Sequence, residues 1–134
     1  MKPVAVLDAS AFLAYLQGEN GAEKVAAVLC ETACISAVNW LEVLRKLYDR
    51  GINPKQAIDV IKKHVCFESS LIIIPVDKEI ALYAAKLQPF AKEKGLSLGD
   101  ITCLALGQFK NIPVLTADRI WKTLKSSIEI QLIR

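Results

Sequence analysis

Short aliphatic segments alternate with stretches of helical periodicity along this whole sequence. The aliphatic segments cover residues 3–8, 33–36, 71–76, 112–116 and 128–133. The third of them, LIIIPV, is a continuous apolar run of the kind found in strands that are covered on both faces. Strands that alternate with helices are typical of parallel sheets. The pattern therefore predicts an α/β fold: a three-layer α/β/α sandwich with a five-stranded, mainly parallel sheet.

The length of the chain limits this fold to one domain, residues 1–134. A chain of this size buries about two thirds of its surface on folding. Hydrophobic residues make up 53% and charged residues 23%, which excludes intrinsic disorder. The longest aliphatic run, 71–74, is far shorter than the ~20 residues of a membrane span. Pro3 and Asp8 interrupt the apolar region that a signal peptide needs, so we expect a cytoplasmic protein without membrane association.

Prolines and cysteines give further local expectations. Pro54 is expected to open a helix, and Pro89 to kink or divide the helix predicted over 77–94. The chain has no C-x-x-C motif and a single histidine, His64, which makes a zinc site unfavourable. The four cysteines are therefore expected to be buried free thiols: Cys30, Cys34, Cys66 and Cys103. In particular, we expect no disulfide between Cys30 and Cys34.

Four acidic residues occupy special places in the predicted fold. Asp8 ends the first strand, and Asp118 follows the fourth. Glu42 and Asp100 lie in the first turns of two helices. Because ligands of parallel sheets bind beyond the carboxyl ends of the strands, we expect these four carboxylates to converge there. The first strand should then be central, since Asp8 must reach acids on both sides.

Each of these acids also has a purely structural interpretation. Asp8 and Asp118 could cap helices, for roughly 0.5–2 kcal/mol each. The pairs Ser97/Asp100 and Asn39/Glu42 are spaced like capping boxes, and Glu42 could pair with Lys46.

The four acids together are harder to explain by capping alone. At an effective dielectric constant near 20, two carboxylates 4 Å apart repel by about 4 kcal/mol. Such a cluster requires a cation or raised pKa values. Oxygen ligands without histidine favour Mg²⁺ or Mn²⁺, which can position a phosphodiester and activate water.

Four segments carry a resemblance to a known family: VLDASAFLAYL, ISAVNWLEVLRKL, GLSLGDITCLALG and PVLTADRIWKTL. In this order they resemble the signature blocks of PIN-domain nucleases, and most closely those of VapC toxins from type II toxin–antitoxin systems. The resemblance implies that Asp8, Glu42, Asp100 and Asp118 are the catalytic and metal-binding residues. It also implies supporting roles for a second set of residues: Ser10, Asn39 and Thr116. One departure is Ile101, where many relatives carry a basic residue.

The resemblance further implies a Mg²⁺- or Mn²⁺-dependent endoribonuclease that cleaves tRNA or rRNA by metal-activated water. Without the four acids the net charge of +3 becomes +7, which suits an RNA substrate. Three cations after Asp118 are candidate phosphate contacts: Arg119, Lys122 and Lys125. A toxin also implies an antitoxin, and a homodimer is expected. The apolar hairpin over 37–66 would accept an antitoxin helix. Three residues are candidate contacts, although each of them is favoured to pack in the core instead: Trp40, Leu44 and Ile61.

Other functions are less consistent with the residues. A phosphatase of the haloacid dehalogenase type needs a second aspartate two residues after the first, where this chain has Ser10. A receiver-like phosphoacceptor domain needs an acid pair at the first strand and an aspartate ending the third, which passes through Pro75 instead. Two alternatives stay open: a catalytically silent PIN fold that acts as an interaction module, and a solitary RNA-processing nuclease.

Overall fold

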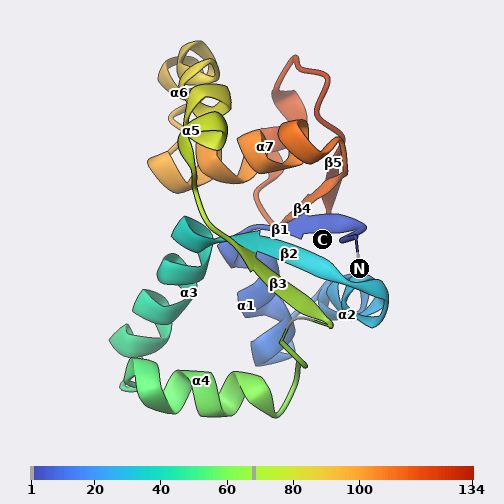
Figure 1. Ribbon diagram of the computed structural model, residues 1–134, viewed down its shortest axis with the longest axis vertical. Helices are drawn as coiled ribbons and strands as arrows, with labels where there is room; N and C mark the ends of the chain where they lie inside the picture. Colours follow the sequence, from blue (N-terminus) through green and yellow to red (C-terminus); the bar gives the residue numbers. More distant parts are fainter. Residues whose placement is uncertain (1, 68) are drawn as a thin grey trace.

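A sheet of five parallel strands forms the centre of the computed structural model, which describes residues 2–67 and 69–134 (Figure 1). The strand order is β3-β2-β1-β4-β5. The strands are β1 (Ala5–Leu7), β2 (Ala33–Ser36), β3 (Leu71–Ile74), β4 (Val114–Thr116) and β5 (Ile130–Leu132). Every neighbouring pair is parallel, so the carboxyl ends of all five strands meet at one edge. The predicted fold class and the central position of β1 are confirmed.

Helices cover both faces of this sheet (Figure 1). One face carries α1 (Ala9–Gln17), α2 (Ala22–Glu31), α3 (Ala37–Asp49) and α4 (Pro54–Lys62). The other carries α5 (Lys78–Ala85), α6 (Gln88–Lys94), α7 (Leu98–Lys110) and the 3₁₀ helix η1 (Arg119–Thr123).

The alternation of side chains along each strand divides the core into two layers. In β1, Leu7 packs into the layer formed with α1–α4, while Val6 packs into the layer formed with α5, α7 and η1. Both side chains are fully buried. The central strand is thus covered on both faces, which explains its uninterrupted apolar sequence.

Prolines set several element boundaries. Pro89 lies in the first turn of α6, and α5 ends at Ala85, so the predicted helix over 77–94 is divided. Pro54 opens α4 as expected. Two strands are shorter than predicted, since β3 ends before Pro75 and β4 begins after Pro113, whereas β2 has its predicted bounds. Proline has no N–H to donate to a sheet, which limits pairing at these positions.

The cysteine expectation is correct in part. All four cysteines are free, including Cys30 and Cys34. Cys34 and Cys103 are buried, but Cys30 and Cys66 are exposed, so burial was wrongly expected for those two. Cys30 lies near the end of α2, whose buried residues are Val25 and Leu29. An apolar sequence neighbourhood therefore does not place every side chain of an amphipathic helix in the core.

The three predicted antitoxin contacts differ in how far they are buried. Trp40 and Leu44 are half-buried, whereas Ile61 is fully buried in the core against the sheet. Ile61 therefore packs in the core, as the favoured alternative expected, and is not available as a surface contact. Among the described residues, no helix is both long and apolar enough to span a bilayer.

Candidate active site

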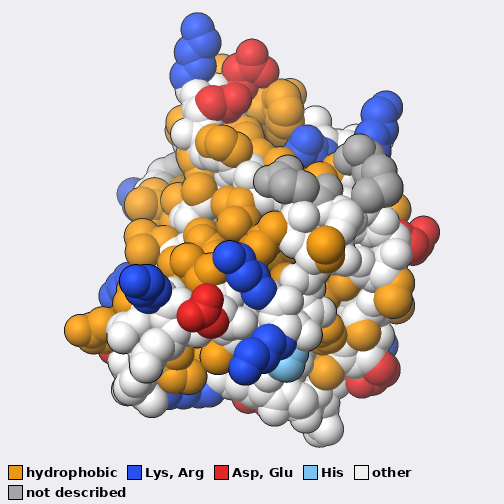
Figure 2. Space-filling model, turned by 60° about the horizontal axis from the view of Figure 1, so that its bottom comes forward, with side chains coloured by type: hydrophobic (Ala, Val, Ile, Leu, Met, Phe, Trp, Pro, Cys, Tyr) orange, Lys and Arg blue, Asp and Glu red, His pale blue; other side chains and the backbone are white. Residues whose placement is uncertain are grey.

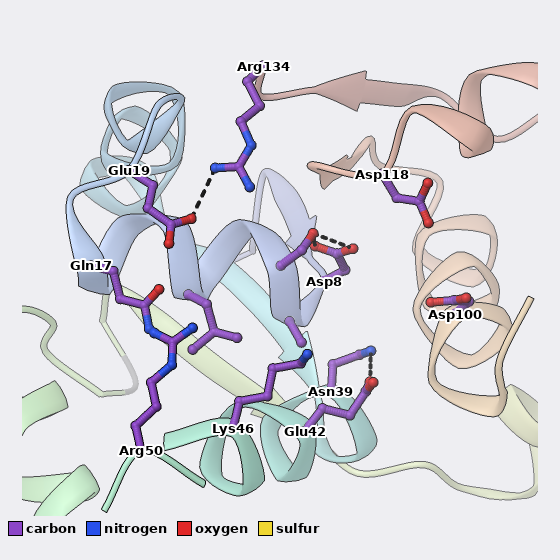
Figure 3. A pocket seen from close by; sticks show the side chains of 13 residues that line it. Asp8, Gln17, Glu19, Asn39, Glu42, Lys46, Arg50, Asp100, Asp118 and Arg134 are labelled. Atoms are coloured by element: carbon purple, nitrogen blue, oxygen red, sulfur yellow. Dashed lines mark hydrogen bonds and ion pairs between the residues drawn. The ribbon is translucent and has the colours of Figure 1, made fainter. Parts of the chain in front are cut away.

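A pocket of about 270 Å³ lies at the carboxyl edge of the sheet (Figure 3). All four predicted carboxylates line it: Asp8, Glu42, Asp100 and Asp118. They come from four different places in the sequence, namely the end of β1, the second turn of α3, the first turn of α7 and the start of η1. The parallel topology brings them together, because β1, β2 and β4 all end at this edge.

Asp8 is the most buried of the four, with 6% of its surface exposed. Its side chain caps α1 by accepting from the backbone N–H of Ala11, at 2.8 Å. Its Oδ2 accepts from the Thr116 hydroxyl at 2.6 Å, and the Ser10 hydroxyl donates to Oδ1 at 2.8 Å. No described Lys or Arg forms an ion pair with Asp8. Capping and pocket lining thus coexist in this residue.

Burial raises the pKa of the Asp8 carboxyl from 3.8 to about 6. The hydrogen bonds from Thr116, Ala11 and Ser10 lower the pKa, but they do not compensate for desolvation. The charge of Asp100 raises it further. Asp8 is therefore a carboxylate held in place by donors yet lacking a counter-ion.

Ser10 and Thr116 connect Asp8 to the segment after β4. The Ser10 hydroxyl accepts from the backbone N–H of Ala117 at 3.0 Å, while it donates to Asp8. The Thr116 hydroxyl accepts from the N–H of Asp118 at 3.0 Å, while it donates to Asp8. Both hydroxyls thus fix the Asp8 carboxylate relative to the backbone that carries Asp118.

Glu42 is held by Asn39, but not through the capping box expected from their spacing. The N-cap of α3 is Ser36, whose hydroxyl accepts from the backbone N–H of Asn39. Asn39 lies inside the helix, and its Nδ2 donates to Glu42 Oε1 at 2.8 Å and to the carbonyl of Gly99 at 3.1 Å. The interpretation of Asn39 as a cap is therefore wrong. Its buried amide instead joins α3 to α7 beside the pocket.

Burial also raises the pKa of Glu42, although the Asn39 hydrogen bond lowers it. The charge of Asp100 raises the pKa of Glu42, as it does that of Asp8. Three of the four carboxylates are thus electrostatically coupled within one pocket.

Asp100 and Asp118 are engaged with backbone groups at the starts of their helices. Asp100 forms the predicted capping box, in which its Oδ2 accepts from the Ser97 N–H and the Ser97 hydroxyl accepts from the Asp100 N–H. Asp118 is exposed and caps η1 by accepting from the Ile120 N–H at 3.0 Å. Each aspartate keeps a second oxygen that makes no side-chain hydrogen bond to the described residues.

The donor set of the pocket suits a hard divalent cation. Its lining contains carboxylate, hydroxyl and amide oxygens, without histidine or cysteine. In the described part of the chain, no three Asp, Glu, His or Cys side chains are close enough to form a metal site as they stand. Mutual repulsion keeps uncompensated carboxylates apart, and the buried Asp8 lacks a positive partner. The residues therefore fit a cation chemically, while Asp100 and Asp118 would have to turn toward it.

Cations in the pocket were not identified from the sequence as site residues. Lys46, Arg50 and Arg134 line it, whereas the predicted phosphate contacts Arg119 and Lys122 do not. Lys125 lines a separate pocket of about 200 Å³ beside α6. Glu42, Lys46 and Arg50 are spaced four residues apart, which places them on one face of a helix, so Lys46 and Arg50 could have been predicted to lie near Glu42. No sequence pattern links Arg134 to the pocket, because only the fold brings it there.

The raised pKa of Asp8 leads to a pH-dependent stability. A carboxyl that titrates at a higher pH in the folded chain makes folding less favourable as pH rises between the two pKa values. Wild-type protein should therefore lose roughly 2.4 kcal/mol at this group between pH 4 and pH 7. The asparagine in Asp8→Asn does not titrate, so this variant should not show the loss. Its free energy of unfolding relative to wild type, measured in urea without metal, should therefore increase from pH 4 to pH 7.

The substitution also alters the hydrogen bonds of residue 8, but that effect is present at both pH 4 and pH 7. It therefore cancels when the change of stability with pH is compared between Asp8→Asn and wild type. Asp59→Asn, which removes an exposed carboxylate on α4, is the matched control. Parallel stability profiles for wild type and Asp8→Asn would contradict the assignment of Asp8 as a desolvated carboxyl.

The fold resembles solved toxin–antitoxin structures. A chain of DNA-bound VapBC from Salmonella typhimurium is 15% identical, with a TM-score of 0.74 over 99% of this chain and 100% of that one. A chain of promoter-bound VapBC2 from Rickettsia felis is 14% identical, with a TM-score of 0.73 over 96% and 97%. VapC20 from Mycobacterium tuberculosis, a sarcin-ricin loop cleaving toxin, is 15% identical, with a TM-score of 0.64 over 93% and 98%.

At these identities, the solved structures show a shared fold alone. No curated protein matches the chain by sequence. The sequence model of the PIN domain, however, matches residues 5–126, a range that contains all four pocket carboxylates. The chain therefore belongs to the PIN-domain family.

Proposed function

We propose that this protein is a Mg²⁺- or Mn²⁺-dependent endoribonuclease and the toxin of a type II toxin–antitoxin pair. The observation that carries the proposal is the buried Asp8 carboxylate, which shares a pocket with Glu42 and Asp100 and has no ion-pair partner among the described residues. A divalent cation bound there would position a phosphodiester, help to activate water and stabilise the leaving oxygen.

The residues of the pocket have distinct roles in this proposal. Asp8 provides a fixed carboxylate, because Ser10 and Thr116 hold both of its oxygens. Asn39 orients Glu42 toward α7. Asp100 and Asp118 complete the negative charge of the pocket from the starts of α7 and η1. We propose all four acids as catalytic, metal-binding residues and the three partners Ser10, Asn39 and Thr116 as supporting residues.

The structural neighbours support the substrate class and the partner. VapC20 is a sarcin-ricin loop cleaving toxin, and VapBC is a family of toxin–antitoxin systems. We therefore propose structured RNA, tRNA or rRNA, as substrate and a cognate antitoxin as partner. The net charge of +3 is compatible with an RNA substrate. Arg119, Lys122 and Lys125 stay candidate contacts for more distant phosphates, outside the pocket.

The face formed by α3 and α4 is the proposed antitoxin site. Figure 2 shows hydrophobic side chains gathered on the face that comes forward in this view, with Lys and Arg side chains around them. On these two helices Leu41 and Tyr48 are more than half exposed, and Val60 is 39% exposed. Trp40 packs edge-on against Phe67 at 5.8 Å between ring centroids. An amphipathic helix is a suitable occupant of such a surface. We also propose a homodimer that acts in the cytoplasm.

A solitary RNA-processing nuclease would use the same pocket without an antitoxin. A short neighbouring reading frame with a DNA-binding N-terminus would favour the toxin. A silent interaction module is the weaker alternative, because all four carboxylates are present.

The nuclease proposal predicts metal-dependent cleavage that requires Asp100. Wild-type protein should cleave total RNA with Mg²⁺ or Mn²⁺ and not with EDTA. Asp100→Asn should lose activity by about 100-fold or more, because even residues that only support metal ligands commonly contribute 10–100-fold. Asp59→Asn has the same change of charge on the surface of α4 and should cleave normally. Cleavage by Asp100→Asn at the wild-type rate would refute the catalytic role of this cluster.

Gly99 gives a second test, because it leaves room for Glu42. A Cβ at this position would lie 2.2 Å from Glu42 Oε1 and 2.7 Å from its Cδ. Gly99→Ala should therefore displace the carboxylate and lower the cleavage rate by about 10-fold or more. Stability should change little, because the half-buried Glu42 side chain can move away and alanine favours a helix by ~1 kcal/mol over glycine.

Leu98→Ala is the control for Gly99→Ala. Leu98 is the preceding residue, 73% exposed, and does not line the pocket. Cleavage rates and thermal unfolding should be measured for both variants. If Gly99→Ala is as active as Leu98→Ala, the position of Glu42 does not limit the reaction.

A further inference from the structure

We propose that Lys46, Arg50 and Arg134 form a phosphate-binding subsite, here called the cationic wall, for the RNA backbone next to the scissile phosphodiester. The inference rests on the proposed nuclease function and deepens it. All three residues line the same pocket as the four carboxylates. The pocket would thus hold two successive parts of one phosphodiester chain, one at the acids and one at the cations.

Charge is segregated within the pocket. Figure 3 shows Asp100, Asp118 and the Asn39–Glu42 pair toward one side, with Asp8 between them and the opposite side. Arg50 and Arg134 lie toward that opposite side, while Lys46 lies between the two groups, beside the Asn39–Glu42 pair, and its charge lowers the pKa of Glu42 (Figure 3). A single small anion would use only one side. A chain with repeated phosphates can use both, with a cation near the acids.

Two of the cations follow Glu42 along one face of α3. Glu42, Lys46 and Arg50 are spaced four residues apart, and Arg50 is the C-cap of the helix. Lys46 and Arg50 make no ion pair or side-chain hydrogen bond with any residue that the structure describes. Like charges at this spacing repel each other, so a bound anion would relieve an existing repulsion.

Arg134 reaches the pocket from the other side and is held in position. Its Nη1 donates to Glu19 Oε1 and to the Asn20 carbonyl, both at 3.1 Å. These bonds tie the end of the described chain to the turn between α1 and α2. They leave Nη2 and Nε without a hydrogen bond to the described residues, and a guanidinium offers its donors in a planar fork that matches a phosphate. Glu19 is therefore a positioning residue for Arg134.

The wall would contact phosphates rather than bases. Lys and Arg contacts to phosphate fix the register of a nucleic acid and carry no sequence information. The pocket should thus require a phosphate beside the scissile bond, whatever the neighbouring base. Removal of the wall is therefore predicted to lower the affinity for the RNA substrate.

Binding without metal tests the wall independently of catalysis. The probe is a fluorescent single-stranded oligoribonucleotide, measured by anisotropy in EDTA over 50–300 mM KCl. The test variant is Lys46→Gln/Arg50→Gln/Arg134→Gln. The matched control removes three exposed charges from α4 and the turn after it, in Lys55→Gln/Lys62→Gln/Lys63→Gln. A third protein, Arg119→Gln/Lys122→Gln/Lys125→Gln, tests the cations of η1 and the loop after it.

The wall variant should bind at least tenfold more weakly than the control variant at low salt. The slope of log K against log salt should decrease by about 2, since each phosphate contact of a single strand contributes roughly 0.7. Arg134→Gln alone should lower this slope by about 0.7. The single variant replaces the triple variant in the test if the triple variant does not fold. Cleavage assays with Mg²⁺ should show a raised KM in the wall variant.

Equal binding by the wall and control variants would overturn the subsite, as would a loss of affinity in the η1 variant alone. The two proposals fail separately. Wild-type protein that binds RNA through the wall but never cleaves it would refute the nuclease function only. Normal metal-dependent cleavage with wild-type KM in the wall variant would refute the wall only.

Discussion

The buried carboxylate of Asp8 is the constraint on which the rest of the site depends. Placed at the end of the central strand, it is almost fully buried at the wall of the pocket and fixed by donors from three residues: Ser10, Ala11 and Thr116. Those donors hold it in one orientation without neutralising it. A protein that keeps such a group at the centre of an acidic pocket has given up stability there, as is common at functional sites.

Capping and function are combined in the same side chains. Asp8, Asp100 and Asp118 each accept a backbone N–H at the start of a helix, which fixes where the carboxylate stands. The parallel sheet then places these helix starts at one edge. The structural and the functional interpretations of these acids are therefore compatible, and capping helps to place negative charges where the positive ends of helices make them less unfavourable.

Much of this arrangement could be predicted from the sequence because it follows from local rules. Apolar runs identify buried strands, and a parallel sheet brings their carboxyl ends together, so the shared pocket of Asp8 and Asp118 was predictable. Long-range packing was not. Arg134 enters the pocket only because its side chain pairs with Glu19, which lies 115 positions away in the sequence. Asn39 could not be told from a cap by its sequence position, because serine and asparagine cap helices about equally well and the structure uses Ser36, three residues earlier.

Crystals of the protein soaked with Mn²⁺ test the central claim most directly, through anomalous scattering. The account predicts an anomalous peak in the pocket within about 2.0–2.3 Å of carboxylate oxygens, with Asp8 among the ligands. The peak should be lost in Asp8→Asn crystals of the same form. A manganese ion bound elsewhere, or one bound equally well in Asp8→Asn, would contradict a metal-dependent site built around this carboxylate.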